Sequence, residues 1–258
     1  MKLELQDVSF KYGATPILDS ISLTLDKSEL ICIMGPNGVG KSTLMYCMNR
    51  LLKPTEGVVY IEDKPIEEIK RIELAKTIGF VPHKSSETFS ASVLDTVLMG
   101  RVPYLKIGGI SNEDVEIAET SLKRVNMEQF AMHPFDELSA GQHQRVMIAR
   151  GLAQEPKILL LDEPTANLDL KYQMDVMQTL RDLVRERNIT IITTCHDLNI
   201  LSRYSDRVIL MHERKIYCNG HPTEVITVEN IKTLYDVDSR IIEVEGRPFV
   251  IPLSNESK

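Results

Sequence analysis

Residues 30–45 read LICIMGPNGVGKSTLM, and this stretch decides the fold. Its first five residues are all apolar, which is typical of a strand covered on both faces in a parallel sheet. GPNGVGKST at 35–43 then matches the phosphate-binding loop pattern, which connects a strand to a helix. Strand, loop and helix in this order predict a nucleoside-triphosphate site on an α/β fold.

The residue types in this loop suit a polyphosphate. The glycines let backbone N–H groups surround the β-phosphate, and the N-terminus of the following helix adds a partial positive charge. Lys41 is expected to neutralise the β- and γ-oxygens, and the Ser42 hydroxyl to bind Mg²⁺. The predicted nucleotide-binding residues of the loop are Gly35, Pro36, Asn37, Gly38, Val39, Gly40, Lys41, Ser42 and Thr43.

Two more apolar runs, ILLLD at 158–162 and ITIITT at 189–194, extend the prediction of a mainly parallel sheet. The run at 30–34 is followed by apolar residues at helical spacing, Leu44, Met48 and Leu51. The run at 158–162 is followed in the same way by Val176, Leu180 and Leu183. Near the N-terminus, an edge-type strand that begins with Leu3, Leu5 and Val8 is expected to pair antiparallel with a strand of alternating apolar residues, Ile21, Leu23 and Leu25.

Helical patterns replace the strands further along the chain, notably at 115–125 and 139–153. Beyond residue 205 the pattern predicts two short strands, a helix around 222–235 and a last strand pair around Gly246. We therefore expect a single domain. Its predicted parts are a nucleotide-binding core at 1–83 and 156–205, an inserted α-helical subdomain at 84–155 and a C-terminal β/α extension at 206–258.

Composition narrows the class of protein. The 258 residues carry 30 Lys plus Arg and 37 Asp plus Glu, a formal net charge of −7, which argues against binding to nucleic acid. No apolar run approaches the roughly 18 to 20 residues of a membrane span, and the N-terminus MKLELQDVSF has no secretory-signal pattern. A cytoplasmic location is expected, with the four cysteines, at 32, 47, 195 and 218, as reduced thiols.

ILLLDEP at 158–164 places two carboxylates at the end of a buried strand. Open α/β sheets bind their ligands at the carboxyl ends of the strands. Asp162 suits water-mediated binding of Mg²⁺, and Glu163 suits polarisation of the attacking water as a general base. The alternative for these acids is simple capping of the strand end.

LSAGQ at 138–142 begins a predicted helix, with Ser139 as N-cap and Gly141 allowing a close approach to an anion. This segment resembles the signature motif of the ABC-transporter ATPases, with Ala140 in place of the usual glycine. The other motifs stand in that family's order: Tyr12, the phosphate loop, VP at 81–82, ILLLDEP, NLD at 167–169 and TTCHD at 193–197. The resemblance covers essentially the whole chain.

The resemblance implies the fold of the phosphate-loop NTPases and the cofactors ATP and Mg²⁺. It assigns Ser139, Gly141 and Gln142 to the γ-phosphate of an ATP held by a facing protomer, and hence implies a homodimer. Tyr12 resembles the aromatic residue that stacks on adenine, or else it closes a strand end before Gly13.

Two further roles follow from the resemblance. Asp169 resembles the acid that couples the two ATP sites across the dimer, and it is also a natural helix N-cap. His196 resembles the switch histidine that contacts the γ-phosphate and steadies the water, although a histidine after a buried strand can also be purely structural.

One position departs from the family pattern. After VP at 81–82, where the family carries glutamine in contact with Mg²⁺ and water, this chain has His83. A neutral imidazole can also accept a hydrogen bond from water or ligate Mg²⁺-bound solvent. Alternatively, His83 points away and its loop acts only as a hinge.

Two segments, 92–105 and 233–253, resemble ATPases of importers for iron–siderophore complexes, haem and cobalamin. This resemblance implies two membrane-spanning permease subunits, an extracytoplasmic substrate-binding protein and a place at the cytoplasmic face of the membrane. Importers of molybdate, tungstate or a simple metal ion are the alternative within the family. A non-transport ABC ATPase acting on nucleic acid or the ribosome is the alternative from another class.

Overall fold

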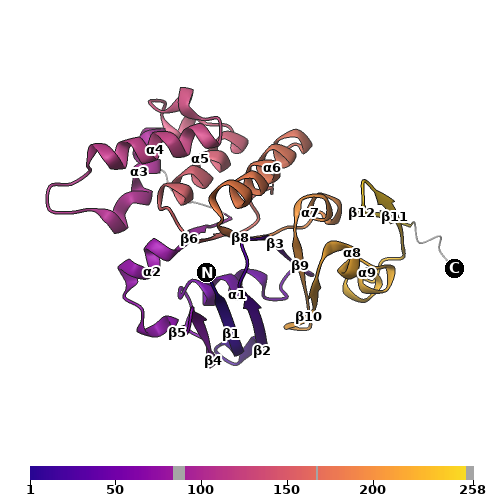
Figure 1. The fold of residues 1–258 in the computed structure, drawn as a ribbon. Coiled ribbons are helices and arrows are strands. Elements are labelled where there is room, and N and C mark those ends of the chain that lie inside the picture. The colour runs from indigo at the N-terminus through magenta and orange to yellow at the C-terminus, as the bar shows by residue number, and fades with distance from the viewer. Residues whose placement is uncertain (84–90, 167, 254–258) are drawn as a thin grey trace. The chain divides into compact units, whose positions relative to one another are not determined.

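The computed structural model describes residues 1–258 except 84–90, 167 and 254–258 (Figure 1). The chain forms two compact units. Unit 1 contains residues 1–68 and 192–258, and unit 2 contains residues 69–191. Within the described ranges, no helix has both the length and the apolar character needed to cross a lipid bilayer.

Unit 1 contains an antiparallel sheet. Its strands are β1 (Leu3–Tyr12), β2 (Thr15–Leu25), β4 (Glu56–Ile61) and β5 (Lys64–Pro65), in the order β2-β1-β4-β5. The antiparallel pairing of β1 with β2 is confirmed, but the prediction that β1 is an edge strand is wrong. Leu5 pairs with Leu23 on one side and with Val59 on the other, so β1 is an inner strand. Alternating apolar residues indicate one buried face and do not reveal how many neighbours a strand has.

The phosphate loop follows a parallel strand pair in unit 1. β3 (Leu30–Met34) is buried at all five positions and pairs in parallel with β9 (Arg207–His212), which pairs antiparallel with β10 (Lys215–Gly220). The helix after the loop, α1 (Lys41–Met48), is shorter than the apolar spacing suggested. Leu51 lies beyond its end and is exposed, because Arg50 adopts a left-handed conformation that stops the helix.

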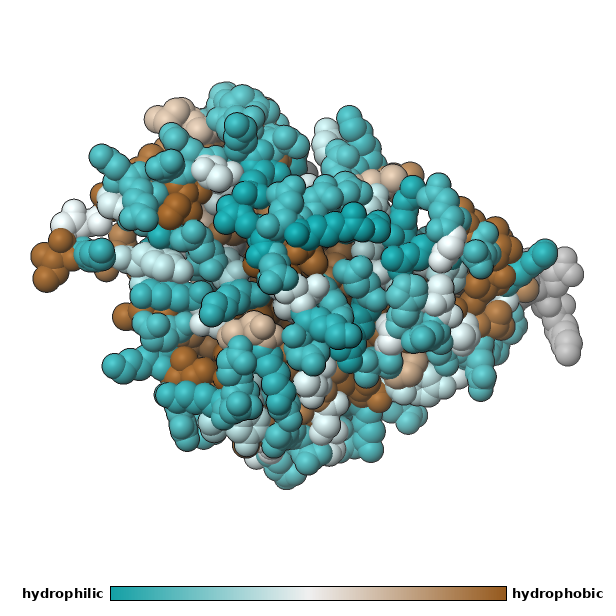
Figure 2. Space-filling model, viewed as in Figure 1, coloured by the Kyte–Doolittle hydropathy of each residue, from teal (hydrophilic) through white to brown (hydrophobic). Residues whose placement is uncertain are grey.

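The C-terminal part of unit 1 contains α7 (Leu198–Tyr204), α8 (Pro222–Val225), α9 (Val228–Tyr235) and the hairpin of β11 (Ser239–Val244) and β12 (Arg247–Pro252). The helix predicted around 222–235 is two helices, because Ile226 leaves the helical conformation and Thr227 caps a new one. On the hairpin, Ile242, Phe249 and Ile251 are exposed, and Figure 2 shows apolar surface where Figure 1 draws β11 and β12.

Unit 2 contains the predicted helical segment, whose first residues, 84–90, lie outside the described ranges. Its helices are α2 (Arg71–Thr77), α3 (Val93–Leu98), α4 (Asn112–Arg124), α5 (Ala140–Ala153) and α6 (Leu170–Arg187), with 3₁₀ turns η2 (Met99–Tyr104), η3 (Glu128–Phe130) and η4 (Phe135–Glu137). α3, α4 and α5 pack against one another (Figure 1). The helices predicted at 115–125 and 139–153 are confirmed as α4 and α5.

Two parallel strands complete unit 2. β6 (Ile78–Val81) pairs with β7 (Ile158–Leu161), which is buried throughout. Gly151 of α5 allows the helix to approach them, because a Cβ there would lie 2.9 Å from a methyl carbon of Val81. The chain passes from unit 2 to unit 1 within the fully buried strand β8 (Thr190–Thr194). The mixed α/β fold with mainly parallel buried strands and an antiparallel sheet is as predicted.

Candidate nucleotide-binding site

The phosphate loop in unit 1 uses glycine where the backbone allows nothing larger. Gly35 has φ +151°, and a Cβ on it would lie 2.3 Å from the carbonyl oxygen of Met211. Gly40 has φ +108°, and its Cβ would lie 2.8 Å from the carbonyl oxygen of Ile17. Both positions combine a left-handed backbone with a close approach to another backbone group, so any side chain would distort the loop.

Lys41 folds back over this loop. It is only 6% exposed, and its Nζ donates hydrogen bonds to the carbonyl oxygens of Gly35, at 2.9 Å, and Pro36, at 3.1 Å. α1 begins at Lys41, and its N-cap Gly40 has no side chain with which to cap the first-turn N–H groups. These N–H groups and the ammonium form an anion-binding site of the kind that holds a phosphate.

Tyr12 and His196 also lie in unit 1. The Tyr12 ring, at the end of β1, is 52% exposed and meets Phe10 edge-on, with the ring centroids 4.8 Å apart. An exposed aromatic face suits stacking on a base. His196 is exposed between β8 and α7, where Asp197 caps α7 by accepting hydrogen bonds from the N–H groups of Asn199 and Ile200.

The predicted acids lie together at the end of β7 in unit 2. Asp162 is 3% exposed, and its N–H donates to the carbonyl oxygen of Val81 at 2.9 Å. Glu163 has φ +50°, a left-handed conformation that costs a non-glycine residue about 1–3 kcal/mol. Such strain is often found at functional sites, and here it coincides with the carboxylate predicted to act as general base.

His83 faces Glu163. Its Nδ1 lies 3.5 Å from Glu163 Oε2, and this buried nitrogen has no hydrogen-bond partner among the described residues. The side chain therefore does not point away from the acids. The carboxylates of Asp162 and Glu163 are the kind of oxygen ligand that Mg²⁺ prefers, and the His83 nitrogen can accept a hydrogen bond from Mg²⁺-bound water.

The signature segment forms the start of α5. Ser139 accepts a hydrogen bond from the Gln142 N–H at 3.4 Å, and the Gln142 side chain accepts one from the Ser139 N–H at 2.9 Å, a capping box. Ser139 and Ala140 are exposed, so this helix terminus is open to solvent in unit 2. The Tyr172 ring on α6 lies 3.5 Å from the Cβ position of Gly141, a contact that the sequence does not indicate, because a single tyrosine on an amphipathic helix belongs to no motif.

Asp169 is the N-cap residue of α6, but its side chain makes no capping hydrogen bond. The Gln173 N–H instead donates to the Asp169 carbonyl oxygen at 3.0 Å, and the Asp169 side chain is exposed. Capping by the carboxylate therefore does not explain this residue. Asn167, the first residue of the NLD motif, lies outside the described residues.

The predicted site residues are thus divided between the units. Unit 1 brings Lys41 against Gly35 and Pro36 and carries Tyr12 and His196. Unit 2 brings His83 against Glu163 beside Asp162, and it carries the signature segment and Asp169.

Comparisons with known proteins agree with this set of motifs. A family model described as "ABC transporter" matches residues 18–166. The hemin import ATP-binding protein of Bordetella avium is 35% identical over 250 residues, which cover 94% of this chain and 95% of that protein.

Two solved structures are also similar. An ABC transporter described as metal-chelate type, in an inward-facing conformation, is 30% identical with a TM-score of 0.85 and covers 98% of this chain and 97% of its own. A bacterial ABC transporter cassette solved as a dimer is 34% identical with a TM-score of 0.75, over 85% of this chain and 98% of its own. These matches agree with the phosphate loop around Gly35 and Lys41 and with the signature segment at the start of α5. The chain therefore belongs to the ABC transporter family as an ATP-binding subunit.

Proposed function

We propose that this chain hydrolyses ATP to power the import of a metal chelate through separate membrane-spanning subunits. The observation that carries the proposal is the phosphate loop, in which Lys41 is folded against Gly35 and Pro36 at the open N-terminus of α1. The family match supports ATP as the ligand of this loop.

The residues of this chain have distinct roles in the proposed reaction. Lys41 and the first-turn N–H groups of α1 bind the β- and γ-phosphates, and Glu163 takes the proton of the attacking water. Ser42 and Asp162 would hold Mg²⁺, His83 would accept a hydrogen bond from Mg²⁺-bound water, and His196 would orient the γ-phosphate and the attacking water. When bound, Mg²⁺ neutralises charge on the phosphate oxygens.

The proposed active form is a homodimer. The capped N-terminus of α5 is exposed at Ser139 and Ala140, and a helix N-terminus favours a phosphate group. In the proposed dimer this terminus meets the γ-phosphate of ATP bound to the facing protomer. The cassette solved as a dimer among the similar structures supports the formation of a dimer.

A groove in unit 2 is the proposed contact for a membrane subunit. It has a volume of about 230 Å³, and its lining includes the apolar side chains of Phe80, Pro82, Met99, Val102 and Met147 together with the polar side chains of Arg150 and Gln154. Beside it, the segment at 102–110 exposes four large apolar side chains: Val102, Leu105, Ile107 and Ile110. Exposed apolar side chains beside a groove are typical of a binding site for an amphipathic helix of a partner, because binding removes their apolar surface from water.

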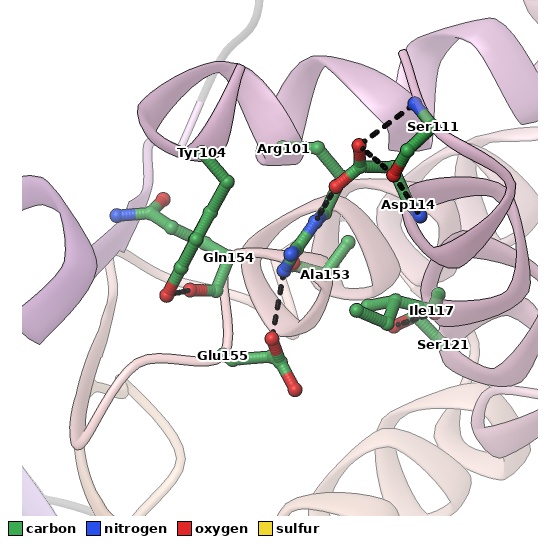
Figure 3. Close-up of polar contacts among 9 residues, drawn as sticks. All are labelled: Arg101, Tyr104, Ser111, Asp114, Ile117, Ser121, Ala153, Gln154 and Glu155. Carbon is green, nitrogen blue, oxygen red and sulfur yellow. Dashed lines mark hydrogen bonds and ion pairs between the residues drawn. The ribbon is translucent and has the colours of Figure 1, made fainter. Parts of the chain in front are cut away.

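A buried ion cluster holds both ends of this segment (Figure 3). Arg101, 4% exposed, donates to Asp114 Oδ1 at 2.9 Å, to the Ala153 carbonyl oxygen at 2.7 Å and to Glu155 Oε2 at 2.8 Å. Its guanidinium carbon lies 4.0 Å from the centre of the Tyr104 ring. Arg101 precedes the apolar segment and Asp114 follows it, and the ion pair between them holds both ends of the segment in place. Arg101 also bonds to Ala153, the last residue of α5, so the segment is anchored to that helix.

The transported compound is proposed from the relatives. The Bordetella avium relative is named for hemin import, and the similar transporter structure is described as metal-chelate type. Iron–siderophore complexes, haem and cobalamin are therefore the first substrates to test. As an importer subunit, the chain would act at the cytoplasmic face of the membrane.

The test is ATP hydrolysis by the chain reconstituted with its membrane subunits and binding protein in proteoliposomes. A metal chelate is expected to stimulate hydrolysis and accumulate inside, whereas molybdate or a simple metal ion should not. Val102→Asp should abolish this stimulation without affecting nucleotide binding. Met132→Asp changes another exposed apolar residue of unit 2 and should retain this stimulation. Stimulation by molybdate alone would overturn the substrate proposal.

A further inference from the structure

Helix α7 packs against strand β12 of the C-terminal hairpin in unit 1 (Figure 1). In the part of the chain that the structure describes, this hairpin is a two-stranded sheet of β11 and β12. Three polar residues spaced three apart, Asn199, Ser202 and Ser205, meet β12 along α7 and its C-terminus. Ser202 and Ser205 are 1% and 0% exposed, so this contact is buried although it is polar. Buried polar groups need hydrogen-bond partners, and β12 supplies them.

Asn199 pairs with β12 as a neighbouring strand would. Its side-chain amide donates to the Val250 carbonyl oxygen at 3.1 Å, and its Oδ1 accepts from the Val250 N–H at 2.7 Å. A carboxamide carries the same donor and acceptor as a peptide group, so Asn199 satisfies both backbone groups of Val250, which is 3% exposed. An aliphatic side chain at this position would leave both groups without these bonds.

Two further hydrogen bonds fasten the rest of α7. The Ser202 hydroxyl donates to the Pro248 carbonyl oxygen at 2.6 Å, and Arg247 Nη1 donates to the Ser205 carbonyl oxygen at 2.9 Å. β12 therefore holds α7 near its start, along its length and at its end. Because a two-stranded hairpin is at best marginally stable alone, the contact stabilises both elements.

The start of α7 also ends the segment that carries His196. Asp197 caps the helix, and its carboxylate accepts a hydrogen bond from the Asn199 N–H at 2.8 Å. On the other side of His196, Cys195 is 3% exposed and follows the buried strand β8. His196 itself is exposed. Its backbone therefore runs between two fixed points, β8 before it and the first turn of α7 after it.

We propose that Asn199 is a positioning residue for His196: through its bonds to Val250 it fixes the first turn of α7, and with it the place of His196 at the nucleotide. This inference rests on the proposed role of His196 in ATP hydrolysis. The hairpin lies beyond residues 18–166, the part of the chain that the family model matches. The C-terminal extension thus contributes to hydrolysis through α7.

The test is Asn199→Ala, which removes both bonds to Val250, in the chain reconstituted with its membrane subunits. We expect kcat per nucleotide site to fall about tenfold, within the roughly 10²-fold that a misplacement of about 1 Å can cost. The affinity for MgADP should stay within about twofold, because ADP has no γ-phosphate for His196 to contact and the phosphate loop is unchanged. Calorimetric titration with MgADP counts the folded sites, so a loss of folded protein does not lower this kcat.

Ser202→Ala is the matched control. It removes one bond between α7 and β12 but leaves both bonds of Asn199 in place. Both variants should lower the unfolding midpoint, since each removes a hydrogen bond to a buried group, but kcat of Ser202→Ala should stay within about twofold of wild type.

The double variant with His196→Ala distinguishes positioning from general stabilisation. If Asn199 acts through His196, Asn199→Ala should lower kcat no further once His196 is absent, because effects on one shared group are not additive. Single-turnover hydrolysis of the wild type, the two single variants and the double variant measures this.

The outcomes separate the inference from the proposed function. If the wild type binds MgADP but His196→Ala hydrolyses ATP at the wild-type rate, the proposed role of His196 fails, and the inference fails with it. If His196→Ala is slow but Asn199→Ala is as fast as wild type, only the positioning role is wrong. A full further loss on adding Asn199→Ala to His196→Ala, or an equal loss in Ser202→Ala, would also overturn it. A loss in Asn199→Ala that disappears in the His196→Ala background would support it.

Discussion

The Nδ1 atom of His83 lies 3.5 Å from the Oε2 atom of Glu163, with His83 following β6 and Glu163 following β7. The two strands are parallel neighbours, so their carboxyl ends deliver both side chains to the same edge. The family carries glutamine at the His83 position. In this chain an imidazole therefore lies directly beside the proposed general base.

His83→Gln is expected to retain ATP hydrolysis stimulated by the membrane subunits, because an amide oxygen can also accept from water or from Mg²⁺-bound solvent. His83→Ala removes that acceptor and should lower turnover by about tenfold or more, as expected for a residue that supports a metal site. Steady-state hydrolysis measured across a range of Mg²⁺ concentrations checks both variants. Identical curves for wild type, Gln and Ala would show that His83 is a spectator.

Glu163→Gln should keep ATP binding and slow hydrolysis by at least about 10²-fold, the effect expected when a positioned general base is lost. Because ATP then persists between the protomers, the closed dimer should accumulate. Single-turnover hydrolysis and size-exclusion chromatography with MgATP measure the two effects. Normal turnover in this variant would make His196 the first candidate for the base.

Lys41→Ala should impair nucleotide binding, whereas Glu163→Gln should impair hydrolysis. Lys41 Nζ belongs to the binding loop, so its loss should weaken nucleotide binding itself. Binding of MgADP, which is not hydrolysed, separates the two variants. Equal affinity in Lys41→Ala and wild type would contradict the assigned role.

The ATPase rate per chain should rise with protein concentration, because the signature segment at 138–142 is proposed to act on ATP held by the facing protomer. Chains with Lys41→Ala and chains with Gly141→Asp should each be nearly inactive alone. Mixing them should restore activity, since one mixed site then contains both an intact lysine and an intact signature. A high, concentration-independent rate from a monomer confirmed by light scattering would exclude the dimer.

Acid should weaken the ion cluster of unit 2. The Ser111 side chain and backbone, and then Arg101, lower the pKa of Asp114 from 3.8 to about 2. The folded pKa is below the unfolded value, so this carboxylate stabilises the fold fully above about pH 4, and its contribution is lost as pH falls towards 2. The difference in unfolding midpoint between wild type and Asp114→Asn should narrow over that range.

The exposed residue Glu119 of the same helix is the control for this measurement, and Glu119→Gln should change the midpoint little at any pH. A constant difference between wild type and Asp114→Asn from pH 6 to pH 2 would show that the charge of Asp114 does not stabilise unit 2.

The sequence by itself determined the local parts of this protein. The strand, loop and helix at 30–48, the buried runs that became β7 and β8, and the capped start of α5 at Ser139 follow from short-range patterns, since burial, glycine conformation and capping each depend on neighbouring residues. The motifs were identifiable for the same reason, because each chemical role requires particular residues within a few positions.

Only the tertiary structure decided which distant residues meet. The pairing of β1 on both sides, the approach of His83 to Glu163, and the cluster that joins Arg101 to Asp114 and Glu155 all connect separate segments. Local periodicity shows which face of an element is buried, but it does not specify the partner that covers it. That choice depends on packing across the whole unit, where residues far apart in the chain become neighbours: Arg101 Nη1 and Glu155 Oε2, 54 positions apart, lie 2.8 Å from each other.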